Sequence, residues 1–330
     1  MIISQTPLRI SLAGGGTDLP SYCSRRDGKV LATAVNKYIF VIIQERFDEQ
    51  IHVNYARRKE VVAEVCEVRH DLVREAMRMA GLSRGFEVTT LADIPSEGSG
   101  LGSSSALTVG LLNAFHAYRG RQVDAETLAR QACTIEIDVC RKPIGRQDQY
   151  IAAYGGMHFF IFRKDGSVGV ERVDAGSPIL RRLESGLLLY YTNKSRSSDT
   201  LLAKQERRAA ENRAAMDGIR ALAEDSRAAL LQGDVDRVGR NLDRGWQLKK
   251  GLAAGVTDAK IDAFYAKARK AGAIGGRITG AGGGGFFLLY APELRRPRLR
   301  KALSGYRELP IEFEADGSKI MLNMRRRIWK

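Results

Sequence analysis

The sequence predicts an α+β protein with two domains. Its 330 residues are many for one hydrophobic core, and a hydrophobic content of 44% is ample for globular folding. Short β-rich runs dominate the first half, whereas residues 200–270 form a mostly helical stretch rich in alanine and arginine. A glycine loop, a strand at residues 286–290, a helix and a hairpin at residues 310–323 follow. We therefore expect a first domain over residues 1–185 and a second over residues 186–330.

The first domain is expected to combine strands with a few helices. The β-rich runs at residues 37–45 and 50–55 are separated by residues 46–49, which predicts a hairpin. Asp124 is a suitable N-cap for a helix that runs to about Arg141. The other expected elements are strands at residues 2–12, 86–91 and 186–192, a helix at residues 70–80 that ends at Gly81, and a hairpin at residues 157–173 around Lys164, Asp165 and Gly166.

A glycine- and serine-rich stretch stands directly before an apolar helical pattern. Glycines bring backbone N–H groups close to a ligand, and the first-turn N–H groups of a helix lack internal partners. Together with the helix dipole, they predict a polyphosphate site. Its residues are Gly98, Ser99, Gly100, Leu101, Gly102, Ser103, Ser104 and Ser105. The alternative is a glycine-rich turn in which Ser103 or Ser104 caps the helix.

Two common nucleotide-binding motifs do not match this stretch. The sequence contains no G-x-x-x-x-G-K-[ST], and the glycines at 98, 100 and 102 do not form G-x-G-x-x-G. No βαβ pattern opens the chain, which argues against a Rossmann site. A phosphate-binding role therefore requires another fold.

A second glycine loop follows the first predicted strand. It consists of Gly14, Gly15, Gly16, Thr17 and Asp18. The Asp18 carboxylate could cap the next segment, or it could accept hydrogen bonds from sugar hydroxyls in a glycine-walled cleft. Arg9, on the strand, could pair at the surface or direct its charge into the same cleft.

Two acidic residues are further candidates. Glu136 has apolar residues at i−4, i−3, i+3 and i+4, so it is expected on or beside a buried helix face. A buried carboxylate needs a partner, which leaves an internal salt bridge or a Mg²⁺ site facing the phosphate loop. Asp148 lies between two glutamines before an apolar run, where it could simply cap a short helix.

A third glycine segment, residues 277–285, precedes the strand at 286–290. It includes Gly282 and Gly283. So many glycines lose much conformational entropy on ordering. Close approach to another backbone or to a ligand explains these glycines better than a loose connecting loop does.

Composition limits the classes of function. The formal charge of +15 suits nucleic acid, but no basic stripe with interleaved aromatic residues is present, so phosphorylated small substrates explain the charge equally well. The four cysteines have no C-x-x-C spacing, no signal peptide is visible, and residues 99–118 are too polar for a membrane span. We expect a cytoplasmic protein without a membrane or nucleic-acid partner.

These three glycine-rich segments, with Glu136 and Asp148 between the second and the third, resemble the GHMP kinase family. The similar stretches are residues 8–18, 98–106 and 278–285, in the family's order along nearly the whole chain. The resemblance implies a ribosomal S5 domain 2-like N-terminal domain that binds ATP, and a ferredoxin-like C-terminal domain. A homodimer is compatible with it. A non-catalytic sugar- or nucleotide-binding regulator on the same fold is the alternative to an enzyme.

The resemblance also implies roles for individual residues. The loop from Gly98 to Ser105 would wrap the ATP phosphates, Ser104 and Glu136 would hold Mg²⁺, and Asp148 would face the acceptor hydroxyl. Arg9 falls where the family places a cation that lowers the pKa of that hydroxyl. Two departures are Glu97, an acid just before the loop, and Ser105, which stands where alanine is common.

Within the family, the G-G-G-T-D segment and the stretches at 36–38, 147–150 and 192–198 are most similar to sugar-1-kinases. These stretches are most similar to those of kinases of D-glycero-D-manno-heptose 7-phosphate, and next to those of L-fucose kinases. This implies phosphoryl transfer from ATP to an anomeric hydroxyl, in the synthesis of precursors for surface polysaccharides. Asp18 and its glycine loop would hold the sugar, and Lys37 and Arg196 are the expected cations for a sugar phosphate.

Overall fold

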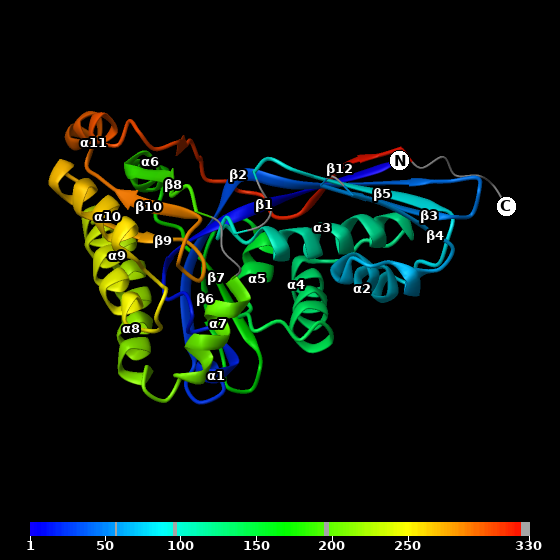
Figure 1. Cartoon of the computed structure of the whole chain (residues 1–330), viewed down its shortest axis with the longest axis horizontal. Helices are drawn as coiled ribbons and strands as arrows, with labels where there is room; N and C mark the ends of the chain where they lie inside the picture. The colour runs from blue at the N-terminus through cyan, green and yellow to red at the C-terminus, as the bar shows by residue number, and fades with distance from the viewer. Residues whose placement is uncertain (57, 95–97, 195–197, 325–330) are drawn as a thin grey trace.

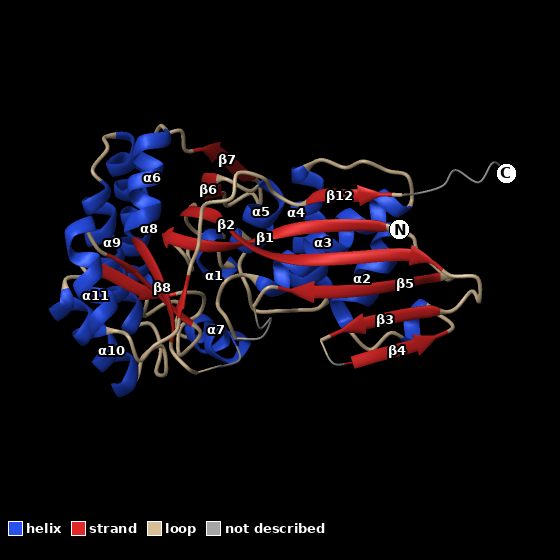
Figure 2. Cartoon of the chain, turned by 90° about the horizontal axis from the view of Figure 1, so that it is seen from above, coloured by secondary structure: helices blue, strands red, loops and turns tan. Residues whose placement is uncertain are grey.

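The computed structural model describes residues 1–56, 58–94, 98–194 and 198–324. Its larger sheet has eight strands and is organised by the long neighbours β1 (Ile2–Ala13) and β2 (Gly28–Glu45). The second half of β2 pairs with β5 (Phe86–Ala92), and its first half pairs with β6 (Met157–Phe162). Figure 2 shows this sheet from above. The other strands are β3 (Ile51–Tyr55), β4 (Arg58–Val62), β7 (Val168–Arg172) and β12 (Lys319–Asn323).

Helices cover one face of the larger sheet, below it in Figure 1. The central one is α3 (Ser103–Tyr118), which packs against both β1 and β2 and is buried on most of its surface. Its neighbours are α2 (Asp71–Ala80), α4 (Ala125–Cys133), the π-helical turn η2 (Thr134–Val139) and α5 (Gln147–Tyr154). The short α1 (Pro20–Cys23) follows β1, and a 3₁₀ turn, η1 (Val65–Glu67), precedes α2.

A smaller antiparallel sheet lies beside the larger one, in the order β11-β8-β10-β9. Its strands are β8 (Leu187–Tyr191), β9 (Gly275–Ile278), β10 (Phe286–Tyr290) and β11 (Glu308–Leu309). The accompanying helices are α6 (Ser177–Gly186), α7 (Ser198–Arg207), α8 (Arg213–Leu231), α9 (Val235–Lys250), α10 (Ala259–Ala271), the 3₁₀ turn η3 (Glu293–Arg295) and α11 (Arg296–Ala302).

The main hydrophobic core extends from the larger sheet to one face of the smaller sheet, and the other face of the smaller sheet packs on a separate core. Because strand side chains alternate, Leu187 and Leu189 of β8 join the core of the larger sheet, whereas Leu188 and Tyr190 face a second core around Trp246. The helices α8 and α9 pack against β1, on which the last eight residues are all buried. This end of β1 therefore lies between the two halves of the chain, where it positions the site described below.

Several expected elements are confirmed. The α2 helix ends at Gly81 in the left-handed conformation (φ 74°), and Asp124 caps α4 by accepting a hydrogen bond from the Thr127 N–H at 2.7 Å. β6 and β7 form the expected hairpin. Within the described residues, no helix combines the length and the apolar character needed to cross a bilayer.

Two expected hairpins are wrong. The run at 50–55 does not pair with β2, because β5 lies between them and pairs with β3 in parallel. Residues 310–323 form no hairpin either: β11 ends at Leu309, before this run, and pairs with β8 in the smaller sheet, whereas β12 pairs with β1. In both places the residues between the strands suit a hairpin turn. The strands nevertheless pair with strands distant in sequence, β3 with β5 and β12 with β1. The expected domain boundary at 185/186 lies at the end of α6, and β12 returns the chain to the larger sheet.

Candidate active site

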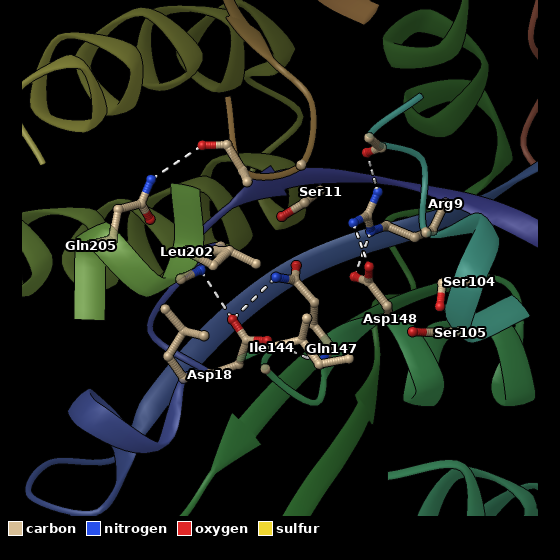
Figure 3. Close-up of a pocket in the computed structure, with 18 of the residues that line it drawn as sticks. Arg9, Ser11, Asp18, Ser104, Ser105, Ile144, Gln147, Asp148, Leu202 and Gln205 are labelled. Carbon is tan, nitrogen blue, oxygen red and sulfur yellow. Dashed lines mark hydrogen bonds and ion pairs between the residues drawn. The ribbon is translucent and has the colours of Figure 1, made fainter. Parts of the chain in front are cut away.

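A cavity of about 630 Å³ opens where the two halves of the chain meet. Figure 3 shows that its walls come from the β1–α1 loop, the loop before α3, the segment before α5, and helix α7. The expected site residues that line it are Arg9, Gly15, Gly16, Asp18, Gly98, Ser99, Gly100, Gly102, Ser103, Ser104, Ser105 and Asp148. Most of the sequence-predicted site is therefore assembled around one cavity.

Other expected residues support the cavity without lining it. Leu101 and Thr17 are buried, and the Thr17 hydroxyl donates to the Gly14 carbonyl at 2.8 Å. The remaining expected glycines belong to the glycine loops at residues 14–18 and 277–285 but do not line the cavity: Gly14, Gly282 and Gly283.

The structure does not bring Lys37 to the cavity, which corrects its expected role in binding a sugar phosphate. Its ammonium group donates instead to the backbone and side-chain oxygens of the adjacent Asn36, at 3.0 and 3.2 Å. Arg196, the other expected cation, lies outside the described residues.

The loop before α3 has the backbone of an anion site. Gly98, Gly100 and Gly102 all have positive φ, between 71° and 80°, which favours glycine. Gly102 is the N-cap residue of α3, and no side chain caps this helix. The serine N-cap considered from the sequence is therefore absent, and the serine hydroxyls bind elsewhere.

The third glycine segment packs backbone to backbone against this loop. A Cβ on Gly100 would lie 2.7 Å from the Thr279 carbonyl oxygen, and one on Gly280 would lie 2.7 Å from the Gly100 Cα. The Thr279 hydroxyl also donates to the Ser99 carbonyl at 3.2 Å. The expectation of close approach to another backbone is thus confirmed. The third glycine segment, which connects two strands of the smaller sheet, holds the phosphate loop in place.

Glu136 lies fully buried under the first turn of α3. The π-helical turn η2 carries it, a distortion of the kind often found at functional sites. Its carboxylate accepts hydrogen bonds from the hydroxyls of Ser104 (2.8 Å) and Ser105 (2.7 Å) and from Gln149 Nε2 (2.6 Å). Burial raises the pKa of Glu136, while these donors and the Lys142 ammonium oppose the rise.

This cluster fits a Mg²⁺ site in which the phosphates of a bound nucleotide supply the remaining ligands. Ser104 is exposed to the cavity, and its hydroxyl links the surface to the Glu136 carboxylate below. In the described part of the chain, no three or more His, Cys, Asp or Glu side chains lie together so that they could hold a metal ion. Mg²⁺ in phosphoryl-transfer sites commonly uses one or two protein groups together with phosphates and water, so a larger cluster is not required.

Arg9 and Asp148 form a bidentate ion pair beside the loop (Figure 3). Arg9 Nε donates to Asp148 Oδ1 at 2.8 Å, and Nη2 donates to Oδ2 at 2.7 Å. Arg9 Nη1 also donates to the Gly100 carbonyl at 2.6 Å. Arg9 is 5% exposed and Asp148 is 23% exposed, so the pair is fixed while the carboxylate remains open to the cavity.

Asp18 lies at the opposite end of the cavity and is fully buried. Its carboxylate accepts from the backbone N–H groups of Gly16 (3.0 Å) and Gln147 (3.1 Å), and from Gln147 Nε2 (3.1 Å). Burial raises the pKa of Asp18, the Gln147 N–H opposes this, and the charge of Asp148 raises it further. Asp18 thus caps α5 rather than the segment that follows it.

Two buried cations that line the cavity, Lys249 and Arg277, were not expected from the sequence. A signal for Lys249 was present, because it follows Trp246 and Leu242 by three and seven residues and so shares their buried helix face. Arg277 is the first residue of the third glycine segment and lies on β9, a strand whose four residues are all buried.

The glycine loop at a helix N-terminus, the buried glutamate and the half-buried carboxylate that faces the cavity define a phosphotransferase that uses a nucleotide. Residues 62–156 match the family described as GHMP kinases N terminal domain, and residues 226–307 match the GHMP kinases C terminal family. The chain belongs to the GHMP kinase family, whose members use ATP as the phosphate donor.

Similar proteins include a D-glycero-α-D-manno-heptose 7-phosphate kinase of Campylobacter jejuni, 30% identical over 92% of this chain and 93% of the relative. A crystal structure described as a D-glycero-D-manno-heptose 1-phosphate kinase from Bacteroides thetaiotaomicron superimposes with a TM-score of 0.82, at 29% identity, over 98% of this chain and 100% of the other. A bifunctional fucokinase/GDP-fucose pyrophosphorylase of Arabidopsis thaliana is 24% identical over 93% of this chain and 32% of the relative.

Proposed function

We propose that this protein transfers the γ-phosphoryl group of ATP to the anomeric hydroxyl of D-glycero-D-manno-heptose 7-phosphate and so forms a 1,7-bisphosphate. Support comes from the 30% identical relative, which is described as a kinase of that sugar phosphate and aligns along 92% of this chain. The single observation that carries the chemistry is the Arg9–Asp148 pair beside the glycine–serine loop, which combines a fixed carboxylate with a nearby anion site.

In the proposed mechanism, the backbone N–H groups of residues 98–105 bind the nucleotide phosphates. Ser104 and Glu136 would hold Mg²⁺, which neutralises charge on the phosphoryl oxygens. Asp148 accepts the proton of the attacking hydroxyl, as a carboxylate within hydrogen-bond reach can. Arg9 orients that carboxylate, and its charge stabilises the developing alkoxide.

Sugar recognition is proposed at the other end of the cavity. Asp18 accepts hydrogen bonds from sugar hydroxyls, and Gly14, Gly15, Gly16 and Thr17 form the wall that carries it. The geometry supports this role, because Gln147 N and Nε2 fix the Asp18 carboxylate, which is buried and lines the cavity. Gly282 and Gly283 are proposed to close the cleft from the C-terminal half.

We also propose that ATP binding belongs to residues 1–185 and that residues 186–330 complete the sugar end of the cavity. A cytoplasmic location is part of this proposal, since ATP is available there and the four cysteines, all free thiols, stay reduced.

L-fucose kinase activity is the second candidate, because the fucokinase relative aligns with nearly all of this chain. A substrate panel separates the two. ADP release is measured with heptose 7-phosphate, unphosphorylated heptose, L-fucose, D-galactose and D-mannose, and ³¹P NMR identifies the phosphorylated carbon. We expect the highest kcat/KM with heptose 7-phosphate and a new phosphate at C1. Faster turnover of L-fucose, or phosphorylation at another carbon, would refute the proposal.

A further inference from the structure

The sugar end of the cavity contains two deeply buried cations, Lys249 of α9 and Arg277 of β9. Each is 5% exposed, and both line the cavity. Neither forms a salt bridge with an acidic residue in the described part of the chain. The Lys249 ammonium donates to the Gly280 carbonyl, whereas Arg277 Nε is buried without a hydrogen-bond partner among the described residues.

Such an arrangement is costly for the free protein. Burial lowers the pKa of Lys249 well below its usual range, Arg277 and Arg9 lower it further, and the charge of Asp18 opposes the decrease only in part. Burial, with the charge of Arg9, also lowers the pKa of Arg277 to about 10. Two buried cations without an acidic partner destabilise a fold unless an anion neutralises them. This cost is understandable if the anion belongs to a ligand.

The surroundings of Arg277 leave room for that ligand. A Cβ on Gly15 would lie 3.4 Å from Arg277 Nη2 and 3.0 Å from Ser11 Oγ, so the absence of a side chain keeps this space open. Ser11 Oγ and Gln147 Oε1 are also buried without hydrogen-bond partners among the described residues. A hydroxyl donor and an amide acceptor beside two cations suit a phosphate group attached to a polyhydroxylated chain.

We propose that Lys249, Arg277 and Ser11 form an anion subsite that binds the phosphate already carried by the acceptor sugar. This inference rests on the proposed sugar-kinase function and deepens it. The subsite selects phosphorylated sugars because a phosphomonoester dianion neutralises both cations, whereas an unphosphorylated sugar would leave them buried and unpaired.

The position of the cations distinguishes this phosphate from those of the nucleotide. Arg277 lies against Gly15, in the loop that carries Asp18. The negative charge of Asp18 also raises the pKa of Lys249, which places Lys249 near the same loop. On the nucleotide side, a different cation, Lys142, donates to the Ser104 hydroxyl at 3.3 Å. The cavity lining thus includes Lys142 and Arg9 beside the serine loop, where Arg9 is already paired with Asp148, and Lys249 and Arg277 beside the sugar loop.

The test compares heptose 7-phosphate with unphosphorylated heptose in Lys249→Met and Arg277→Met. The wild type should prefer the phosphorylated sugar by about 100-fold or more in kcat/KM, and either variant should lose most of this preference. The KM for ATP should stay within about threefold. Lys260→Met and Arg213→Met, which remove the same charges from exposed positions on α10 and α8, are the matched controls and should behave as the wild type.

Two kinetic outcomes would overturn the subsite. One is an equal loss of kcat/KM for both sugars, and the other is a raised KM for ATP with the preference intact. Thermal unfolding of the ligand-free proteins adds a second criterion. Because each substitution removes a buried unpaired charge, the melting temperature should be unchanged or higher, whereas a structural role predicts a large decrease.

The subsite can also be tested if the wild type turns over no heptose, an outcome that would refute the proposed function alone. Calorimetry then measures binding of inorganic phosphate while a non-hydrolysable ATP analogue fills the nucleotide site. The wild type should bind phosphate, and the Lys249→Met, Arg277→Met double variant should bind at least about tenfold more weakly. Equal binding by the two proteins would refute the subsite.

Discussion

The most direct test of the mechanism is Asp148→Asn. Asparagine preserves the volume of the side chain and one hydrogen bond from Arg9, but it cannot accept a proton from the substrate. Loss of a general base reduces turnover by about 10²–10⁴-fold, which corresponds to roughly 3–5 kcal/mol of activation free energy. One N–H of the buried Arg9 also loses its acceptor, because the Asn amide nitrogen is itself a donor. We expect kcat to fall in this range.

ATP binding should be preserved, because Asp148 lies beside the phosphate loop and not within it: a Cβ on Gly102 would be 3.4 Å from Asp148 Oδ2. Steady-state ADP release gives kcat, and calorimetry with a non-hydrolysable analogue gives the affinity for nucleotide. Asp138→Asn is the matched control, since Asp138 is exposed on η2. Formate should restore part of the turnover of Asp148→Ala, in which the carboxylate position is vacated. A kcat for Asp148→Asn within threefold of the wild type would refute the role of Asp148 as base.

Three further variants test the metal, the loop and a buried histidine. Glu136→Gln should raise the Mg²⁺ concentration needed for half-maximal ADP release by about 10–100-fold, and an unchanged requirement would contradict the metal role. Gly100→Ala should lower the free energy of unfolding in urea by about 1–3 kcal/mol, because alanine would be strained at φ 74° and would clash with Thr279. Gly81→Ala, at the same φ of 74° but with no atom within 4 Å of the added Cβ, should cost less, and equal costs would exclude the clash. Burial lowers the pKa of His158 below 6.5, so its stabilising contribution is complete above pH 6.5 and is lost as the pH falls from there toward the folded-state pKa. His158→Asn, which retains a donor for the Gly155 carbonyl, should therefore flatten the decrease in unfolding free energy between pH 6.5 and 5.

Local structure could be predicted wherever neighbouring residues determine it. The cap at Asp124 and the left-handed Gly81 depend on a few adjacent residues, and both are confirmed. Strand pairing depends on which free edge a strand meets. Residues 50–55 pair with β5 rather than with β2, and no local pattern indicates that a strand from residues 86–92 will be inserted between them.

In the candidate site, too, features set by neighbouring residues could be predicted, whereas features set by the packing of distant elements could not. The sequence predicted that Glu136 would be buried near the phosphate loop, because apolar residues surround it at helical spacing. It did not predict that Ser105 and Gln149 would complete the hydrogen bonds of this carboxylate, since these contacts require α3, η2 and α5 to pack together. Helical spacing indicates that Lys249 shares a buried face, but nothing in the sequence places Lys249 or Arg277, among 53 lysines and arginines, in the cavity.

The position of those two cations follows from the way in which the glycine segments pack. Gly280 accepts the Lys249 hydrogen bond and lies against Gly100, whose own carbonyl accepts from Arg9. A single run of contacts therefore joins α9, the third glycine segment, the phosphate loop and the proposed base. Except for the Arg9–Asp148 ion pair, each contact is to backbone, so its geometry depends on how closely the loops approach. A side chain at position 100 or 280 would separate the loops and shift the cations relative to Arg9, which is why a substitution there should impair both nucleotide and sugar binding, whereas loss of Lys249 or Arg277 should impair the sugar alone.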